Sequence, residues 1–194
     1  MIAHLEGKFT TITPTYVVLD VNGVGYEVHI SLYTHLKIKD LKQGRLLTYL
    51  NIREDAHVLF GFFDELERNL FKHLISVNGV GPNTGRMILS SLTPSEIQLA
   101  ISVGNIGALT AIKGVGPKSA QRLILELQDK LKRETIINES SGAGMGSVVR
   151  TEAMGALTML GFSKAPAERE VDKQLRLNPT LTVEELIKLA LKNL

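Results

Sequence analysis

The sequence predicts an α+β protein of several domains: a β-rich first third, an all-helical middle and a small helical end. Three observations lead to this prediction. Apolar and polar side chains alternate over the first sixty residues, as in half-buried strands. From residue 64 the apolar spacing becomes helical, and a Gly/Ser-rich stretch follows at 135–147. We therefore expect boundaries that give the segments 1–63, 64–134, 135–147 and 148–194.

The first domain, residues 1–63, is expected to contain five short strands. The alternation is clearest at 16–21, 25–30, 46–52 and 58–62, and a further strand is expected near 2–9. Asn22-Gly23 separates two of these strands, and Asn-Gly favours the tight turn of a β-hairpin. Five short antiparallel strands predict a small barrel of the oligonucleotide-binding (OB) type. An SH3-like barrel fits the same pattern, so that alternative stays open at this point.

The middle domain, residues 64–134, contains one motif twice, at 74–86 and 109–122. Each copy has an apolar helix, the tetrapeptide Gly-Val-Gly-Pro, and a second helix that begins at the proline. The glycines allow positive φ and a close approach by a neighbour, while the valine packs between the helices. Proline at the first helical position leaves amides at the helix start pointing outward, where the helix dipole favours an anion.

This repeat resembles the helix-hairpin-helix motif, which holds DNA phosphates through backbone amides without reading bases. Lys118 and Arg122 lie one turn apart at the start of the second copy's last helix and would add positive charge. That helix is expected to run from 118 to about 133. The expected DNA-binding residues are Gly79, Val80, Gly81, Asn83, Arg86, Gly114, Val115, Gly116, Lys118 and Arg122.

Neither hairpin predicts a nucleotide site, and no cofactor is expected. A Walker loop needs Gly-Lys-Ser/Thr after a strand, but Pro117 separates Gly116 from Lys118-Ser119. The dinucleotide fingerprint needs a third glycine, which neither copy has. The chain has no cysteine, and its five histidines show neither paired spacing nor a carboxylate companion. No disulfide, thiolate nucleophile or metal site is therefore expected.

The last segment, residues 148–194, is expected to form three short helices near 148–160, 165–175 and 183–194. The third opens with a capping box, Thr182-x-x-Glu185. The stretch 135–147 is expected to be a flexible linker because its composition buries too little apolar area to offset the entropy of ordering. A small tethered helical unit is more typical of an interaction module than of an active site.

Charge and hydropathy place few limits on function. The net charge is only +2, and the surplus lies in residues 64–134, which carry 9 basic and 7 acidic side chains. The sequence has no apolar run long enough to span a membrane and no signal peptide, so a cytoplasmic location is expected.

The domain order and several local motifs resemble the RuvA family, the DNA-binding subunits of the bacterial Holliday junction branch-migration machinery. The resemblance covers essentially the whole chain. It is most specific at Asn22–Val28, Arg53–Ala56, Gly61-Phe62, Leu70–Lys72, Asn78–Pro82 and Gly114–Lys118. It implies a non-catalytic homotetramer, or an octamer on DNA, that opens a four-way junction into a near-planar cross during recombination, DNA repair and the SOS response. The implied partners are junction DNA, the hexameric ATPase RuvB and the junction resolvase RuvC.

The resemblance also implies roles for individual residues. Glu54 and Asp55 would form an acidic pin, repeated around the tetramer centre, that repels phosphates where the strands cross. Family members often carry a lysine where Asn83 stands, so Arg86 is a candidate substitute for that charge. The last segment would be a three-helix, UBA-like module that docks onto RuvB. Its expected contact residues are Leu160, Gly161, Phe162, Leu186 and Leu189.

Two other functions remain open. In the first, the hairpins hold duplex for a repair glycosylase or nuclease, which requires a catalytic Asp or Lys beside a hairpin or a cluster of acids for a metal. Alternatively, the chain binds duplex or single strands without preference for junctions.

Overall fold

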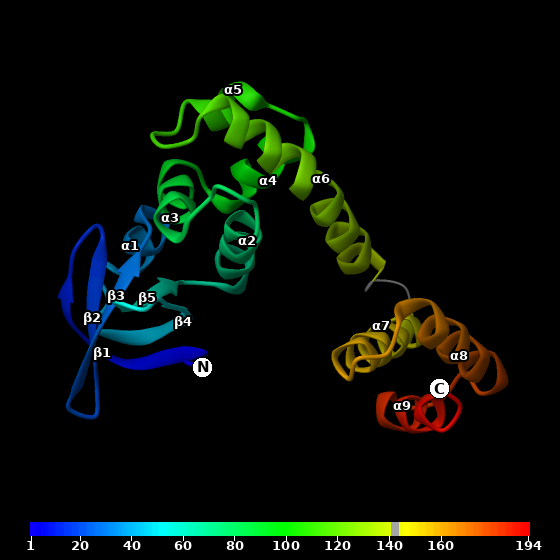
Figure 1. The fold of residues 1–194 in the computed structure, drawn as a ribbon. Coiled ribbons are helices and arrows are strands. Elements are labelled where there is room, and N and C mark those ends of the chain that lie inside the picture. Colours follow the sequence, from blue (N-terminus) through cyan, green and yellow to red (C-terminus); the bar gives the residue numbers. More distant parts are fainter. Residues whose placement is uncertain (141–143) are drawn as a thin grey trace. The chain divides into compact units, whose positions relative to one another are not determined.

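The computed structural model describes the backbone of residues 1–140 and 144–194, and all side chains there except those of 129, 131–140 and 144–148 (Figure 1). It contains two compact units, Met1–Leu131 and Lys132–Leu194, which are described separately. The first holds a β-barrel and helices, and the second is helical, so the α+β prediction is confirmed. Within the described residues, no helix is both long and apolar enough to cross a membrane.

Five strands form a closed barrel in the first unit. They are β1 (His4–Ile12), β2 (Tyr16–Val21), β3 (Val24–Ile30), β4 (Gln43–Ile52) and β5 (His57–Phe62). Their order is β1-β2-β3-β5-β4, and β1 also pairs with β4. All pairs are antiparallel except β3 with β5. This is the OB-type barrel, and the SH3-like alternative is wrong.

Two short motifs of the barrel have clear local causes. Asn22 and Gly23 both adopt positive φ, 53° and 87°, as the predicted tight turn between β2 and β3 requires. Gly61 lies in β5 opposite Ile30 of β3. A Cβ on Gly61 would come within 2.6 Å of the Val28 side chain, so this register leaves room only for glycine.

A helix that the sequence analysis did not predict, α1 (Leu32–Ile38), connects β3 to β4. Ser31 caps it, because its hydroxyl accepts a hydrogen bond from the Thr34 amide at 3.0 Å. Thr34 and Ile38 are buried, whereas Leu36 is 64% exposed. The helix is short, and its apolar positions do not follow one face.

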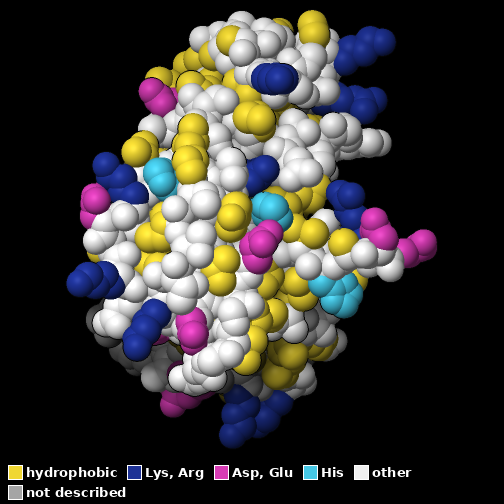
Figure 2. Space-filling view, turned by 90° about the vertical axis from the view of Figure 1, so that its left-hand side faces the viewer, with side chains coloured by type: hydrophobic (Ala, Val, Ile, Leu, Met, Phe, Trp, Pro, Cys, Tyr) yellow, Lys and Arg dark blue, Asp and Glu magenta, His cyan; other side chains and the backbone are white. Residues whose placement is uncertain are grey.

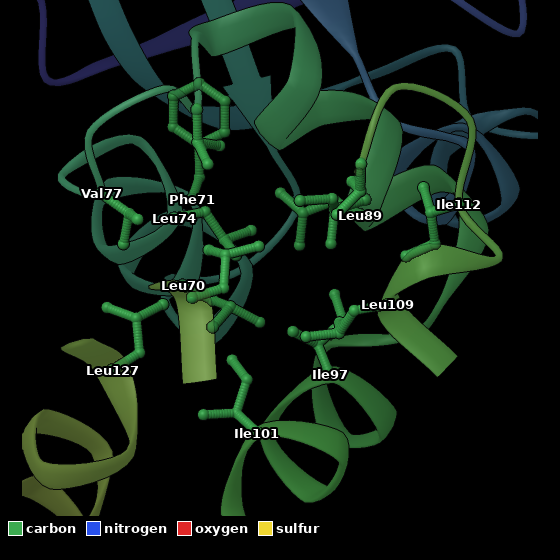
Figure 3. Close-up of a cluster of buried hydrophobic side chains, with 14 of the residues drawn as sticks. Leu70, Phe71, Leu74, Val77, Leu89, Ile97, Ile101, Leu109, Ile112 and Leu127 are labelled. Atoms are coloured by element: carbon green, nitrogen blue, oxygen red, sulfur yellow. The ribbon is translucent and has the colours of Figure 1, made fainter. Parts of the chain in front are cut away.

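Five helices follow the barrel: α2 (Glu65–Ile75), α3 (Pro82–Ser91), α4 (Pro94–Ser102), α5 (Ile106–Thr110) and α6 (Pro117–Ser140), of which α6 belongs to the first unit as far as Leu131. Their side chains converge on one core (Figure 3), and the labelled members are Leu70, Phe71, Leu74, Val77, Leu89, Ile97, Ile101, Leu109, Ile112 and Leu127. Barrel residues belong to the same core. Phe60 and Phe62 of β5 lie with ring centroids 5.3 Å and 4.8 Å from that of Phe71. The period change near residue 64 is therefore a change of secondary structure within one compact unit.

The second unit contains α7 (Gly144–Met159), α8 (Lys164–Leu177) and α9 (Val183–Leu191). The predicted capping box of Thr182 and Glu185 opens α9. Its small core consists of Ala153, Leu157, Ala167, Val171, Leu186 and Ala190. Arg150 links α7 to α8, since its guanidinium donates hydrogen bonds to both carboxylate oxygens of Asp172 and to Glu168.

The expected linker at 135–147 differs from the structure. The backbone is helical at 135–140, where α6 continues past the predicted end near 133, and again from residue 144. Residues 141–143 lie outside the described part of the chain.

Candidate nucleic-acid interface

The two Gly-Val-Gly-Pro segments fold into hairpins of the same geometry, one between α2 and α3 and one between α5 and α6. Gly79 and Gly114 have φ values of 90° and 91°, a conformation that favours glycine. The amides of Val80 and Val115 donate to carbonyls three residues earlier, at 3.0 Å and 3.1 Å. Both valine side chains are 4% exposed and belong to the helical core. The duplication seen in the sequence is therefore also present in the backbone.

Several hairpin amides have no acceptor within the described part of the chain. In the first copy these include the N–H groups of Gly79, Gly81 and Asn83. In the second copy they include the N–H groups of Gly114, Gly116 and Lys118. Because the helix dipole adds partial positive charge at α3 and α6, each set of amides favours an anion.

Neither backbone conformation nor packing within the described part of the chain requires glycine at positions 81 and 116. Neither adopts positive φ, and a Cβ on either would meet no atom within 4 Å. Each directly precedes the helix proline, beside the outward-facing amides. A missing side chain at this place leaves the backbone open to close approach by a group from outside the chain.

Positive side chains accompany the second hairpin. Lys118 and Arg122 are exposed on the first turns of α6. Both line an open hollow, whose other lining residues are Asn78, Gly79, Ser119, Gln121 and Leu125. The hollow thus joins the start of α6 to the tip of the first hairpin. Figure 2 shows Lys/Arg and Asp/Glu side chains scattered over one face of the molecule.

Arg86 lies away from this hollow. Its Nη1 donates to the carbonyl of Thr15, in the barrel turn between β1 and β2, at 2.8 Å. In the 35-residue repeat, Arg86 corresponds to Gln121, whereas Arg122 corresponds to Met87. The expectation that Arg86 replaces the missing lysine is therefore not supported. The first hairpin carries uncharged Asn83 and Met87 where the second carries Lys118 and Arg122.

Glu54 and Asp55 occupy the exposed turn between β4 and β5. The Arg53 amide closes this turn by donating to the Ala56 carbonyl at 2.9 Å. Neither acid forms an ion pair with any described residue, so both charges face solvent. The acidic-pin hypothesis requires that both acids be accessible on the surface of each subunit, and in this turn they are.

The second unit corrects one of the expected contact residues. Leu186 is fully buried in the core of the three helices and is not accessible to a partner. Phe162 and Leu189 are half-buried, and Phe162 packs against that core. Leu160 is 61% exposed. Gly161 follows Leu160 in the turn after α7 and has a φ of 95°.

The sequence analysis missed a neighbouring exposed residue. Met159, 91% exposed, precedes Leu160 at the end of α7. Together Met159 and Leu160 form an apolar tip. The adjacent apolar pair before a glycine was the available signal for it.

The structure also bears on the enzymatic alternative. Among the described residues, no three His, Cys, Asp or Glu side chains are grouped so as to hold a metal ion. The exposed acids of the β4–β5 turn belong to the barrel, whereas the hairpins belong to the helical part. The features gathered around the hairpins are amides and cations, which suit binding of an anion.

Comparisons with known proteins cover the whole chain. Residues 1–61 match the family described as RuvA N terminal domain, 71–129 the SAM-like Helix-hairpin-helix tandem, and 148–194 the RuvA, C-terminal domain. A protein of Cytophaga hutchinsonii is 45% identical over 197 residues, covering 99% of both chains. Proteins of Bacteroides thetaiotaomicron (47% over 201 residues) and Flavobacterium psychrophilum (44% over 194) match over 100% of both chains. All three relatives are named Holliday junction branch migration complex subunit RuvA.

Proposed function

The chain belongs to the RuvA family, and from this premise we propose that it binds four-way junction DNA as the non-catalytic subunit of a branch-migration complex. The observation that carries the proposal is the pair of hairpins with unpaired amides and unobstructed glycines. Two such sites hold phosphates on neighbouring strands and read no bases. Recognition of the junction then depends on shape and not on sequence.

The proposed contacts differ between the two hairpins. The second combines the amides of Gly114, Gly116 and Lys118 with the charges of Lys118 and Arg122. The first offers the amides of Gly79, Gly81 and Asn83 alone. Since only cationic contacts release many counterions, the second hairpin would contribute most of the salt dependence of binding.

Selection of junctions requires more than the hairpins, and we assign it to the barrel in a homotetramer, or in an octamer of two tetramers on DNA. Four copies of Glu54 and Asp55 would place eight negative charges at the centre, where an uninterrupted duplex is repelled. A four-way junction tolerates this charge best because its strands part there. The result would be an open, near-planar junction.

The second unit is proposed to dock the hexameric ATPase RuvB, which would supply the ATP hydrolysis for branch migration. The apolar tip of Met159 and Leu160 and half-buried Leu189 are the proposed contact residues, whereas Leu186 is not. Apolar side chains exposed this far are typical of binding surfaces when they cluster. We further propose that the resolvase RuvC acts on the same junction during recombination and repair, in the bacterial cytoplasm where the chromosome lies.

Binding of the full-length chain to four-way, duplex and single-stranded DNA of the same sequence tests the proposal. The four-way junction should bind far more tightly than the other two, in several unrelated sequences. Equal affinity for duplex would indicate a binder without junction selectivity. Cleavage or base release on any of the substrates would indicate the enzymatic alternative.

The variant Glu54→Gln with Asp55→Asn tests the acidic pin. Removal of the central charges should raise duplex affinity more than junction affinity, and the effect should shrink with salt because screening acts beyond about 8 Å at physiological ionic strength. The matched control is Glu27→Gln with Asp40→Asn, which removes two other exposed acids of the barrel unit. A tetramer with an unchanged duplex-to-junction ratio at low salt would reduce Glu54 and Asp55 to ordinary turn residues.

A further inference from the structure

A buried carboxylate lies where the barrel meets the helices. Glu67 of α2 is fully buried. Its oxygens accept hydrogen bonds from the Ser31 hydroxyl, from the Thr34 hydroxyl at 2.6 Å and from the Phe63 amide at 3.0 Å. These donors belong to the cap of α1, to α1 itself and to the end of β5. One side chain of the first hairpin's leading helix thus holds three parts of the barrel domain.

Stability alone does not explain this arrangement. Burial raises the pKa of Glu67, while the hydrogen bonds from Ser31, Thr34 and Phe63 lower it without offsetting burial. A buried charge is costly, and a well-packed apolar side chain often stabilises a protein as much. A carboxylate adds directional hydrogen bonds. The three donors to Glu67 fix the rotation and position of α2 relative to the barrel.

Arg86 provides a second anchor, on the other helix of the same hairpin. Its Nη1 donates to the Thr15 carbonyl, which also accepts from the Ile30 amide at 3.0 Å. The described side chains of α5 and α6 make no hydrogen bond or ion pair to the barrel. The first hairpin is therefore bound to the barrel by polar contacts on both of its helices, and the second hairpin is not.

We propose that Glu67 and Arg86 are positioning residues that set the first hairpin at a fixed place relative to the barrel and its Glu54-Asp55 turn. The inference rests on the proposed function, in which hairpin amides hold phosphates and the acidic turn lies at the crossing point. Junction selection needs both features in a fixed relation. A plain duplex needs only the hairpins, with the cationic second one contributing most.

The variants Arg86→Met and Arg86→Lys provide the first test. Arg86→Met keeps an unbranched side chain but removes the donor, so the junction-to-duplex affinity ratio should fall about tenfold, as for one lost hydrogen bond of a charged group. Duplex affinity and its salt dependence should not change. Arg86→Lys should restore most of the ratio. If Arg86 instead binds phosphate, Arg86→Met would weaken junction and duplex alike and reduce the salt dependence, which would overturn the assignment.

Glu67 is tested by Glu67→Gln and Glu67→Leu. Gln retains one oxygen acceptor and should keep much of the junction preference, whereas Leu leaves the three donors without an acceptor and should lose it. Val17→Ala, which creates a cavity in the barrel core, is the control for lost stability. All variants are compared at an equal folded fraction, and their oligomeric state is checked.

The outcomes separate the two proposals. If the wild-type chain shows no junction preference, the proposed function fails. If the wild type shows the preference and folded Arg86→Met and Glu67→Leu retain it, the positioning role fails. A loss of preference in Val17→Ala equal to that in Glu67→Leu would also overturn the positioning role, by assigning the effect to stability.

Discussion

At the scale of single residues, Gly81 and Gly116 lie where the hairpin backbone is proposed to contact DNA. Gly116→Ala should change the free energy of unfolding by less than about 1 kcal/mol, because reduced freedom of the unfolded chain opposes the loss of a favourable capping residue. The new methyl group would lie over the free amides and lower junction affinity by about tenfold or more, the effect expected from lost hydrogen bonds to a charged group. Titration of labelled junction DNA measures this.

Gly155→Ala is the matched control for that substitution. Gly155 is exposed in α7, without positive φ and with nothing within 4 Å of a Cβ. This variant should stabilise the second unit slightly and leave DNA affinity unchanged. Wild-type affinity in Gly116→Ala would mean that phosphate does not approach this backbone.

The side chains of Lys118 and Arg122 are expected to act through their charge, and alanine leaves the Lys118 amide in place. Replacement of either by alanine should weaken binding about equally for all DNA sequences and reduce the slope of log affinity against log salt by about one. Asn83→Ala, at the equivalent position of the first hairpin, should leave that slope unchanged. The measurement is a salt series on two unrelated junction sequences. A loss that depends on sequence would contradict a role confined to the DNA backbone.

The sequence located the hairpins but misplaced two side chains. A glycine turn leaves a local pattern, so both hairpins were predicted from sequence alone. The direction of the Arg86 side chain depends on the Thr15 carbonyl of the barrel, which is far away in the sequence. The only local sign was that the 35-residue repeat aligns Arg86 with Gln121 and not with Arg122. Leu186 was mistaken for a surface residue although the sequence shows which side of α9 faces the core. The buried and partly buried residues of this helix follow the spacing of one apolar face, which consists of Val183, Leu186, Ile187 and Ala190.

At the scale of elements, the strands and most helices follow from local spacing, and the exceptions have physical reasons. Helix α1 is a single short segment with exposed Leu36, and its position is determined by contacts that include the Thr34–Glu67 hydrogen bond. Helix α6 runs past residue 133 through the β-branched Thr135, Ile136 and Ile137, which have lower helix propensity. The end near 133 was predicted because the composition of 135–147 is typical of a linker.

The contact between α7 and α8 predicts a pH dependence of stability. Hydrogen bonds from Arg150 hold the pKa of Asp172 below its ordinary value of 3.8. Since the folded pKa is the lower one, this contribution to stability is complete above about pH 4 and is lost as pH falls through the folded value. Asp172→Asn should therefore destabilise the second unit at neutral pH but have no effect in strong acid.

Hydrogen exchange of the α7 and α8 amides across an acid series measures that effect. Glu152→Gln, which removes an exposed acid of α7, is the control and should give a curve parallel to wild type. Equal destabilisation by Asp172→Asn at every pH would show that the ion pair does not cause it.

At the scale of the whole molecule, the two compact units predict separable activities. A chain that ends at Glu139 keeps all of the first unit and should tetramerise and bind junctions, but should not stimulate RuvB. Full-length Leu160→Ser should bind DNA normally and show reduced stimulation, because it alters only the apolar tip. Branch migration assays with RuvB test both. Branch migration supported by the truncated chain would place the docking site in the first unit.

The shared aromatic core of Phe60, Phe62 and Phe71 has a consequence for how the chain is made and unfolded. The last strand of the barrel carries two rings that belong to the core of the helical part and pack against Phe71 of the following helix. A nascent chain therefore cannot complete the barrel before the helices form. Barrel and helices should form one cooperative folding unit. Its calorimetric unfolding should show a single transition whose measured enthalpy equals the van't Hoff enthalpy. Phe71→Leu should accelerate hydrogen exchange in β5 as much as in α2, and residues 64–140 expressed alone should remain unfolded.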